Sequence, residues 1–181
     1  DGSPVEQDHR KIWQIFADHF YLFRGTPTGV WLAHELNVVF DCHLPLNSAT
    51  AQEIYTHIEN CLATPEFQPR RLFERFNIEV LCTTDAATDR LTHHQAILHS
   101  RWDGTVRPTF RPDAVTHLLH PAWSENIEKL SEVSGIVVDA YPNFIKALEE
   151  RRVFFKSMGA RATDHAVESA YTEALSPAEA E

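Results

Sequence analysis

The chain has 181 residues, of which 43% are hydrophobic and 23% charged, a composition typical of one soluble globular domain and not of a disordered or fibrous protein. Its 16 Lys and Arg residues against 26 Asp and Glu residues give a net charge of −10, which argues against partners such as nucleic acid or an anionic membrane. No apolar run is long enough to span a membrane, and three widely spaced cysteines favour a reducing compartment over a disulfide framework, so we expect a cytoplasmic protein.

Residues 1–76 carry apolar side chains at the spacing of amphipathic helices. The clearest start signal in this region is TAQE, where Thr50 is the predicted N-cap and Glu53 completes a capping box. Pro69 is placed to begin a further short helix. We therefore expect a helical region over 1–76.

The pattern changes after residue 76 to short β-rich runs. The stretch IEVLCTT, residues 78–84, is nearly continuous in apolar side chains, as in a parallel strand covered on both faces. A helix over about 89–99 follows, within ordinary boundary error. A second strand is predicted over 104–110, although its Pro108 cannot donate to a sheet ladder.

The remaining sequence predicts two more helices and a third strand. Ser124 is the expected cap of the first helix, and the second runs over 140–159 with Pro142 in its first turn and Gly159 as its left-handed cap. Residues 160–165 form the third predicted strand. Alternating strands and helices predict an α/β fold with about three right-handed parallel units. Because so small a sheet has open edges, we expect further strands outside this chain.

Polar side chains gather where the three predicted strands end. Functional residues of parallel sheets lie at the carboxyl ends of the strands. That rule selects three strand ends: the first carries Thr84 and Asp85, the second Arg111 and Asp113, and the third Asp164 and His165. Because a planar guanidinium can clamp a carboxylate through two hydrogen bonds, Arg111 favours a carboxylated small molecule as the ligand.

Simpler roles remain open for the same residues. Asp85 and Asp164 each precede a predicted helix and are equally good N-caps. Arg111 could form a surface ion pair with Asp113, and His165 could be a hydrogen-bonded structural histidine. Pro112, directly after Arg111, is expected to end the strand and keep the chain extended as it leaves.

Potential metal ligands do not form a recognisable motif in this sequence. The stretches DCH at 41–43, HH at 93–94 and HLLH at 117–120 lack the spacing and partners of a zinc site. The sequence contains no HxH or HExxH motif and no glycine-rich phosphate loop. We therefore expect no metal to bind this chain by itself.

Several stretches together resemble the uronate isomerases, the glucuronate isomerase branch of the amidohydrolase superfamily. They occur in that family's order and are HFYLFRGTP (19–27), RRLFERFNIEVLCTTD (70–85), HHQAI (93–97), TFRPDAV (109–115), LSEVSG (130–135) and FFKSMGARATDH (154–165). The resemblance implies an aldose–ketose isomerase that interconverts D-glucuronate with D-fructuronate, and D-galacturonate with D-tagaturonate, through an enediol. It also implies a distorted (β/α)₈, TIM-like barrel, in which 1–76 is a helical insertion region and 77–181 supplies βα units resembling barrel strands two to four.

The resemblance also implies roles for the strand-end residues. Arg111 matches the substrate-contacting arginine of the family. The other five strand-end residues, Thr84, Asp85, Asp113, Asp164 and His165, would line the site. The family binds a divalent metal, expected to be zinc, through an HxH motif on the first strand and an Asp on the last, and neither is found here. We therefore expect an incomplete segment that is inactive alone and whose partners are a uronate sugar, the remainder of the same enzyme and further copies in a homo-oligomer.

A second hypothesis belongs to another class of protein. The helix-rich composition and the lack of a full catalytic set would also suit a non-catalytic helical module that binds a small molecule or a protein.

Overall fold

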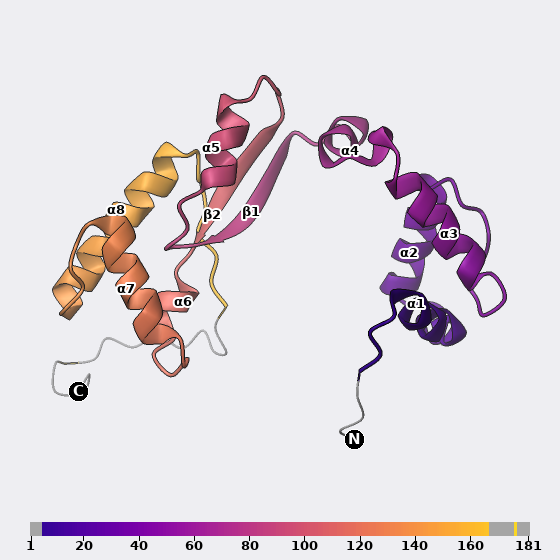
Figure 1. The fold of residues 1–181 in the computed structure, drawn as a ribbon, viewed down its shortest axis with the longest axis horizontal. Helices are drawn as coiled ribbons and strands as arrows, with labels where there is room; N and C mark the ends of the chain where they lie inside the picture. Colours follow the sequence, from indigo (N-terminus) through magenta and orange to yellow (C-terminus); the bar gives the residue numbers. More distant parts are fainter. Residues whose placement is uncertain (1–4, 167–175, 177–181) are drawn as a thin grey trace. The chain divides into compact units, whose positions relative to one another are not determined.

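The computed structural model describes residues 5–166 and 176. The chain divides into two compact units, Asp1–Asn77 and Ile78–Glu181, whose elements are labelled in Figure 1. Within the described residues, no helix combines the length and the apolar character that a membrane span requires.

All the regular secondary structure of the first unit's described residues is helical. Its elements are α1 (His9–Asp18), the 3₁₀ turn η1 (Phe20–Phe23), α2 (Pro27–Val38), α3 (Ala51–Leu62), the 3₁₀ turn η2 (Pro65–Phe67) and α4 (Pro69–Arg75). Its core contains the buried side chains Ala17, Leu36, Cys42, Leu46, Ala51 and Ile54. Pro69 begins α4 as its position in the sequence predicts.

Helix α3 begins where the sequence predicts, but the capping box does not form. Thr50 is the N-cap residue without a side-chain bond to the helix. Its hydroxyl instead donates to the carbonyl of Pro45 at 2.6 Å and accepts from the backbone N–H of Asn47 at 3.1 Å. The preceding loop therefore takes the hydroxyl that the capping box requires.

The second unit is a mixed α/β arrangement in which helices outnumber strands over the described residues. Its elements are β1 (Val80–Ala86), α5 (Thr92–His99), β2 (Thr105–Arg111), α6 (Asp113–Thr116), α7 (Trp123–Ser134) and α8 (Tyr141–Ser157). The two strands pair in parallel, with a register that runs from Val80 opposite Thr105 to Ala86 opposite Arg111.

Two boundaries in this unit differ from the predictions. Helix α5 begins three residues later than the predicted start at 89, because Leu91 adopts a left-handed conformation with φ of 52°. Helix α7 begins at Trp123 with Ala122 as N-cap, so Ser124 lies inside the helix and does not cap it.

The expected third strand is reduced to a single bridge, so over the described residues the prediction of about three strands is corrected to two strands and one bridge. Thr163 pairs in parallel with Phe110, and the N–H of Asp164 donates to the carbonyl of Phe110 at 3.0 Å. Residue 160 is unavailable to the ladder, because the N–H of Ala160 donates to the carbonyl of Phe155 at the end of α8. The segment still extends along β2 and ends at the same edge of the sheet.

Gly159 confirms the predicted end of α8. Its φ is +95°, a conformation that favours glycine, and its N–H donates to the carbonyl of Lys156 at 3.1 Å. Together with the bond from Ala160 to Phe155, this is a Schellman cap that turns the chain back towards β2.

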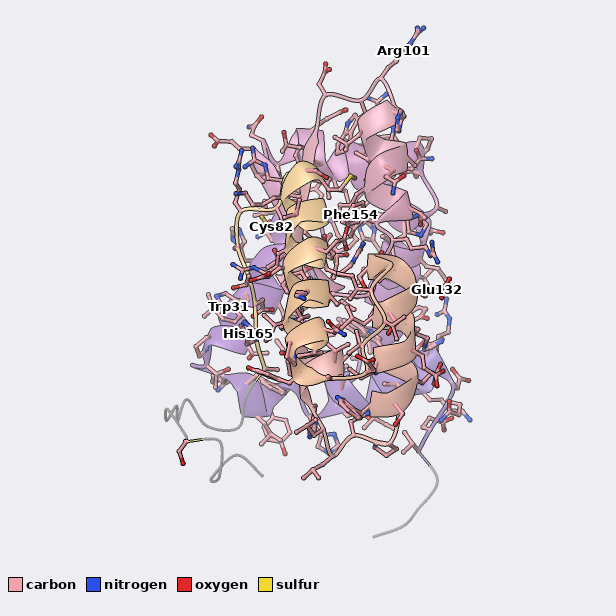
Figure 2. The ribbon with its side chains drawn as sticks, turned by 90° about the vertical axis from the view of Figure 1, so that its left-hand side faces the viewer. Trp31, Cys82, Arg101, Glu132, Phe154 and His165 are labelled. Carbon is pink, nitrogen blue, oxygen red and sulfur yellow. The ribbon has the colours of Figure 1, made fainter. Side chains whose placement is uncertain are left out.

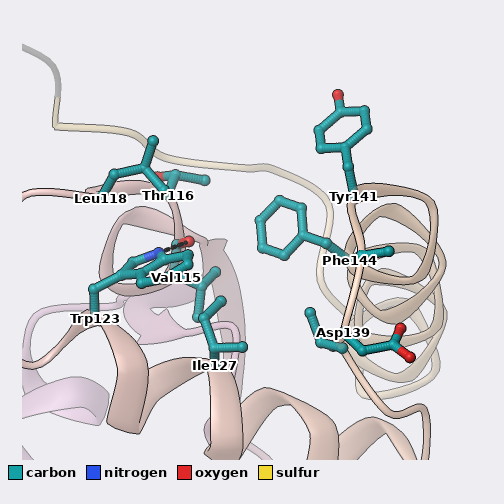
Figure 3. A pocket seen from close by; sticks show the side chains of 10 residues that line it. Val115, Thr116, Leu118, Trp123, Ile127, Asp139, Tyr141 and Phe144 are labelled. Atoms are coloured by element: carbon teal, nitrogen blue, oxygen red, sulfur yellow. Dashed lines mark hydrogen bonds between the residues drawn. The ribbon is translucent and has the colours of Figure 1, made fainter. Parts of the chain in front are cut away.

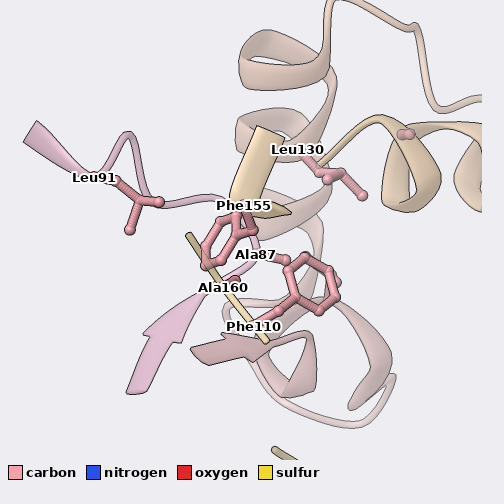
Figure 4. Close-up of a cluster of buried hydrophobic side chains, with 8 residues drawn as sticks. Ala87, Leu91, Phe110, Leu130, Phe155 and Ala160 are labelled. Atoms are coloured by element: carbon pink, nitrogen blue, oxygen red, sulfur yellow. The ribbon is translucent and has the colours of Figure 1, made fainter. Parts of the chain in front are cut away.

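The sheet is covered by helices on one face. Phe110 of β2 and Phe155 of α8 meet edge to face, with ring centroids 5.1 Å apart, in the core drawn in Figure 4. Val80 and Leu81 of β1 are 42% and 46% exposed. Over the part of the chain that the structure describes, the predicted burial of this strand on both faces is therefore not achieved.

Candidate functional site

Four of the six predicted site residues meet at the carboxyl end of β2. A guanidinium N–H (Nη2) of Arg111 donates to Asp164, and Nε of Arg111 lies 3.4 Å from Oδ2 of Asp113. Nδ1 of His165 lies 3.7 Å from Oδ1 of Asp113. Four residues selected by the strand-end rule therefore lie together in the structure: Arg111, Asp113, Asp164 and His165. We call these four residues the Arg111 cluster.

The turn after β2 positions Asp113 beside Arg111. Pro112 is buried and adopts φ of −86° and ψ of 0°, so the chain enters α6 at once instead of leaving extended as expected. Oδ2 of Asp113 also accepts the N–H of Ala166 at 2.9 Å. One carboxylate therefore contacts Arg111 and anchors the segment that carries Asp164.

The cluster holds two carboxylates against one guanidinium. Asp113 and Asp164 offset the single guanidinium of Arg111, whose side chain is 37% exposed, so the predicted ion-pair alternative is present in the structure. Nε of Arg111 is buried and makes no hydrogen bond to the described residues. The cluster can therefore donate and accept hydrogen bonds, but it does not present an uncompensated positive charge.

Thr84 and Asp85 lie on opposite faces of β1. Asp85 pairs in register with Phe110, whose ring packs under α8, whereas Thr84 shares its face with Ala86, the register partner of Arg111. The structure therefore places Thr84 on the face of Arg111 and Asp85 on the helix-covered face. Asp85 is a strand residue and not a helix N-cap.

Asp85 belongs to a polar network that the sequence did not indicate. The hydroxyl of Thr83 donates to Oδ2 of Asp85 at 2.6 Å and lies 2.8 Å from Nε2 of His94 on α5. His94 is 8% exposed. Its spacing of three residues from both Leu91 and Ile97 is a helical-face signal that could have identified it as buried.

The described residues do not form a metal centre. Over residues 5–166 and 176, no group of three or more His, Cys, Asp or Glu side chains is arranged to hold a metal ion. Both carboxylates of the Arg111 cluster contact the guanidinium, which would repel a cation there. The divalent metal implied by the resemblance therefore does not fit these residues, and no step below uses it.

A separate apolar pocket of about 470 Å³ opens between the α6–α7 region and the start of α8 (Figure 3). Its lining includes Val115, Trp123 and Phe144, and the indole N–H of Trp123 donates to the carbonyl of Val115 at 2.9 Å. None of the six predicted site residues lines this pocket.

Known proteins resemble this chain over almost all of its length. The chain is 56% identical over 179 residues to the uronate isomerase of Nostoc punctiforme and 44% identical over 181 residues to that of Xanthomonas campestris, which covers 99% and 100% of this chain. The chain spans only 38% of the length of each of these relatives.

Solved structures agree with the sequence comparison. The crystal structure of glucuronate isomerase from Caulobacter crescentus matches with a TM-score of 0.89 and 42% identity, covering 97% of this chain and 37% of that one. The structure of uronate isomerase from Thermotoga maritima matches with a TM-score of 0.80 and 31% identity, covering 88% and 35%. The sequence profile of the family described as glucuronate isomerase matches residues 5–181. The chain therefore belongs to the glucuronate isomerase family.

Proposed function

We propose that this chain supplies part of the active site of a uronate isomerase that interconverts D-glucuronate with D-fructuronate and D-galacturonate with D-tagaturonate. The observation that carries the proposal is the Arg111 cluster, a polar group assembled at the carboxyl ends of parallel segments in a chain of this family. Relatives named uronate isomerase are 42–56% identical to the chain. No observation favours the alternative of a non-catalytic binding module.

The arrangement of strands supports a barrel as the complete fold. Strand β2 lies between β1 and the segment at Thr163, and the connections between them contain helices. We infer that these three segments are strands two to four of a distorted (β/α)₈ barrel, with residues 1–76 as its helical insertion region. The exposed side chains of Val80 and Leu81 would then be covered by other strands.

The charge balance of the Arg111 cluster decides which substrate atoms it suits. Aldose–ketose isomerisation moves a proton from C2 to C1 of the open-chain sugar and a second proton from the C2 hydroxyl to the C1 oxygen, through an enediol. Arg111, held by Asp113 and Asp164, can donate hydrogen bonds to a hydroxyl or carbonyl oxygen. Because two carboxylates already compensate its charge, such an oxygen suits Arg111 better than the carboxylate of the uronate does.

A graft into a relative tests the proposal. The part of this chain that aligns with the Nostoc punctiforme uronate isomerase, 99% of its length, would replace the matching segment of that enzyme. We expect the graft to convert D-glucuronate with a kcat/KM within about tenfold of the parent enzyme, a change of about 1.4 kcal/mol in barrier height. A graft that folds with the parent's circular dichroism spectrum and assembly state but shows no turnover would overturn the proposal.

A further inference from the structure

Arg151 is a charged residue enclosed in the second unit. It lies on α8, is 4% exposed, and packs its guanidinium 4.3 Å from the ring centre of Phe154. Burial lowers the pKa of Arg151 because desolvation disfavours the charged form, while the neighbouring Glu150 acts in the opposite direction. Burying a charge costs free energy unless hydrogen bonds compensate for it. The hydrogen bonds of Arg151 therefore indicate which segments its side chain holds together.

The guanidinium of Arg151 binds three backbone carbonyls from two different segments. Nε donates to Ala87 at 2.9 Å and Nη2 to Asp89 at 2.8 Å, both in the loop that follows β1. Nη1 donates to Val133 of α7 at 3.3 Å. Arg151 therefore ties the β1–α5 loop to helices α7 and α8.

One of these carbonyls belongs to a residue that also holds the end of β2. The N–H of Ala87 donates to the carbonyl of Arg111 at 2.9 Å, and Ala87 is only 1% exposed. Ala87 thus accepts a hydrogen bond from Arg151 on one side and donates one to Arg111 on the other. This chain of contacts connects α8 to the residue at the centre of the Arg111 cluster.

We infer that Arg151 is a positioning residue for Arg111, which it acts on through Ala87. The inference rests on the proposed role of Arg111 in the uronate site. A planar fork of five N–H donors is required to reach three carbonyls at once, which the ammonium of lysine cannot do with the same geometry. Without the guanidinium, the carbonyl of Ala87 loses its hydrogen bond. The N–H of Ala87 then holds the backbone of Arg111 less firmly.

A double-mutant cycle in the grafted enzyme tests the inference. We expect Arg151→Met to lower kcat/KM for D-glucuronate by about tenfold or more, and Arg151→Lys to restore part of that loss. Arg152→Met is the matched control, because Arg152 is the next residue of α8 and is exposed. It should stay within about twofold of the unsubstituted graft.

The decisive comparison is between Arg111→Met alone and Arg111→Met combined with Arg151→Met. If Arg151 acts through Arg111, the double variant is no slower than Arg111→Met, within about twofold. If the losses of the two single variants multiply in the double variant, this inference is overturned. It is also overturned, without the proposed function, if folded Arg151→Met and Arg151→Lys keep their kinetics while Arg111→Met is impaired. An unimpaired Arg111→Met variant would overturn the proposed role of Arg111 itself.

Discussion

Arg111 lies between two carboxylates that have different tasks. Asp164 accepts from the guanidinium, whereas Asp113 approaches Arg111 with the same oxygen that accepts the N–H of Ala166. The sequence predicted that these residues gather, because each ends or follows a strand. It did not predict the turn at Pro112 that brings Asp113 back to the cluster, since that turn depends on the burial of the proline ring.

Substitution of Asp113 separates its charge from its hydrogen-bonding role. Asp113→Asn keeps an oxygen for the N–H of Ala166 and should lower the free energy of unfolding by less than about 1 kcal/mol. Asp113→Ala leaves that N–H without its acceptor and removes one of the two carboxylates beside the guanidinium, and should cost about 1–3 kcal/mol. Urea unfolding of the two variants measures the difference. Equal costs would contradict the anchoring role of the carboxylate oxygen.

At the scale of elements, helix ends were predictable where one residue decides them. Pro69 and Gly159 mark a helix start and a helix end as expected, because their effect on the backbone is local. Helix α3 also begins after Thr50 as predicted, but without the capping bond that the sequence indicates. Which face of β1 packs against the helices was not predictable in this way. The predicted strand covered 78–84 and the observed one covers Val80–Ala86, and only pairing with β2 shows which side chains face the helices.

The contact between α8 and β2 should dominate the stability of the second unit. Phe155 is 1% exposed and packs edge to face on Phe110, so Phe155→Ala should lower the free energy of unfolding by about 3–5 kcal/mol. Val153 on the same helix is 68% exposed, and Val153→Ala should change the free energy of unfolding by less than about 0.5 kcal/mol. Urea unfolding measures both. If Phe155→Ala does not fold, Phe155→Leu serves in its place. A loss of unfolding free energy at Phe155 no larger than that of Val153→Ala would contradict the proposed packing.

At the scale of the whole molecule, the chain carries the Arg111 cluster and spans 38% of the length of its relatives. The family was predictable because several stretches of the sequence match it in the same order. In the barrel that we propose, the rest of the site comes from the ends of other strands, so this sequence could not predict its structure. A homo-oligomeric assembly stays a prediction.

This division predicts how the 181-residue chain behaves alone. We expect no measurable conversion of D-glucuronate to D-fructuronate, with or without added zinc, because the described residues contain no group that could hold the metal. A coupled assay of the purified chain checks this, with the graft as positive control. Robust turnover by the chain alone would refute the view that other segments complete the site.

The most direct test of the central claim compares two arginines of the second unit in the grafted enzyme. Figure 2 shows Arg101 projecting into solvent at the opposite end of the unit from His165, so Arg101→Met is the control for Arg111→Met. We predict that kcat/KM for D-glucuronate falls about 10- to 100-fold in Arg111→Met, the loss of a charge-assisted hydrogen bond, and stays within about twofold in Arg101→Met. Equal kinetics in the two folded variants would contradict the assignment of Arg111 to the uronate site.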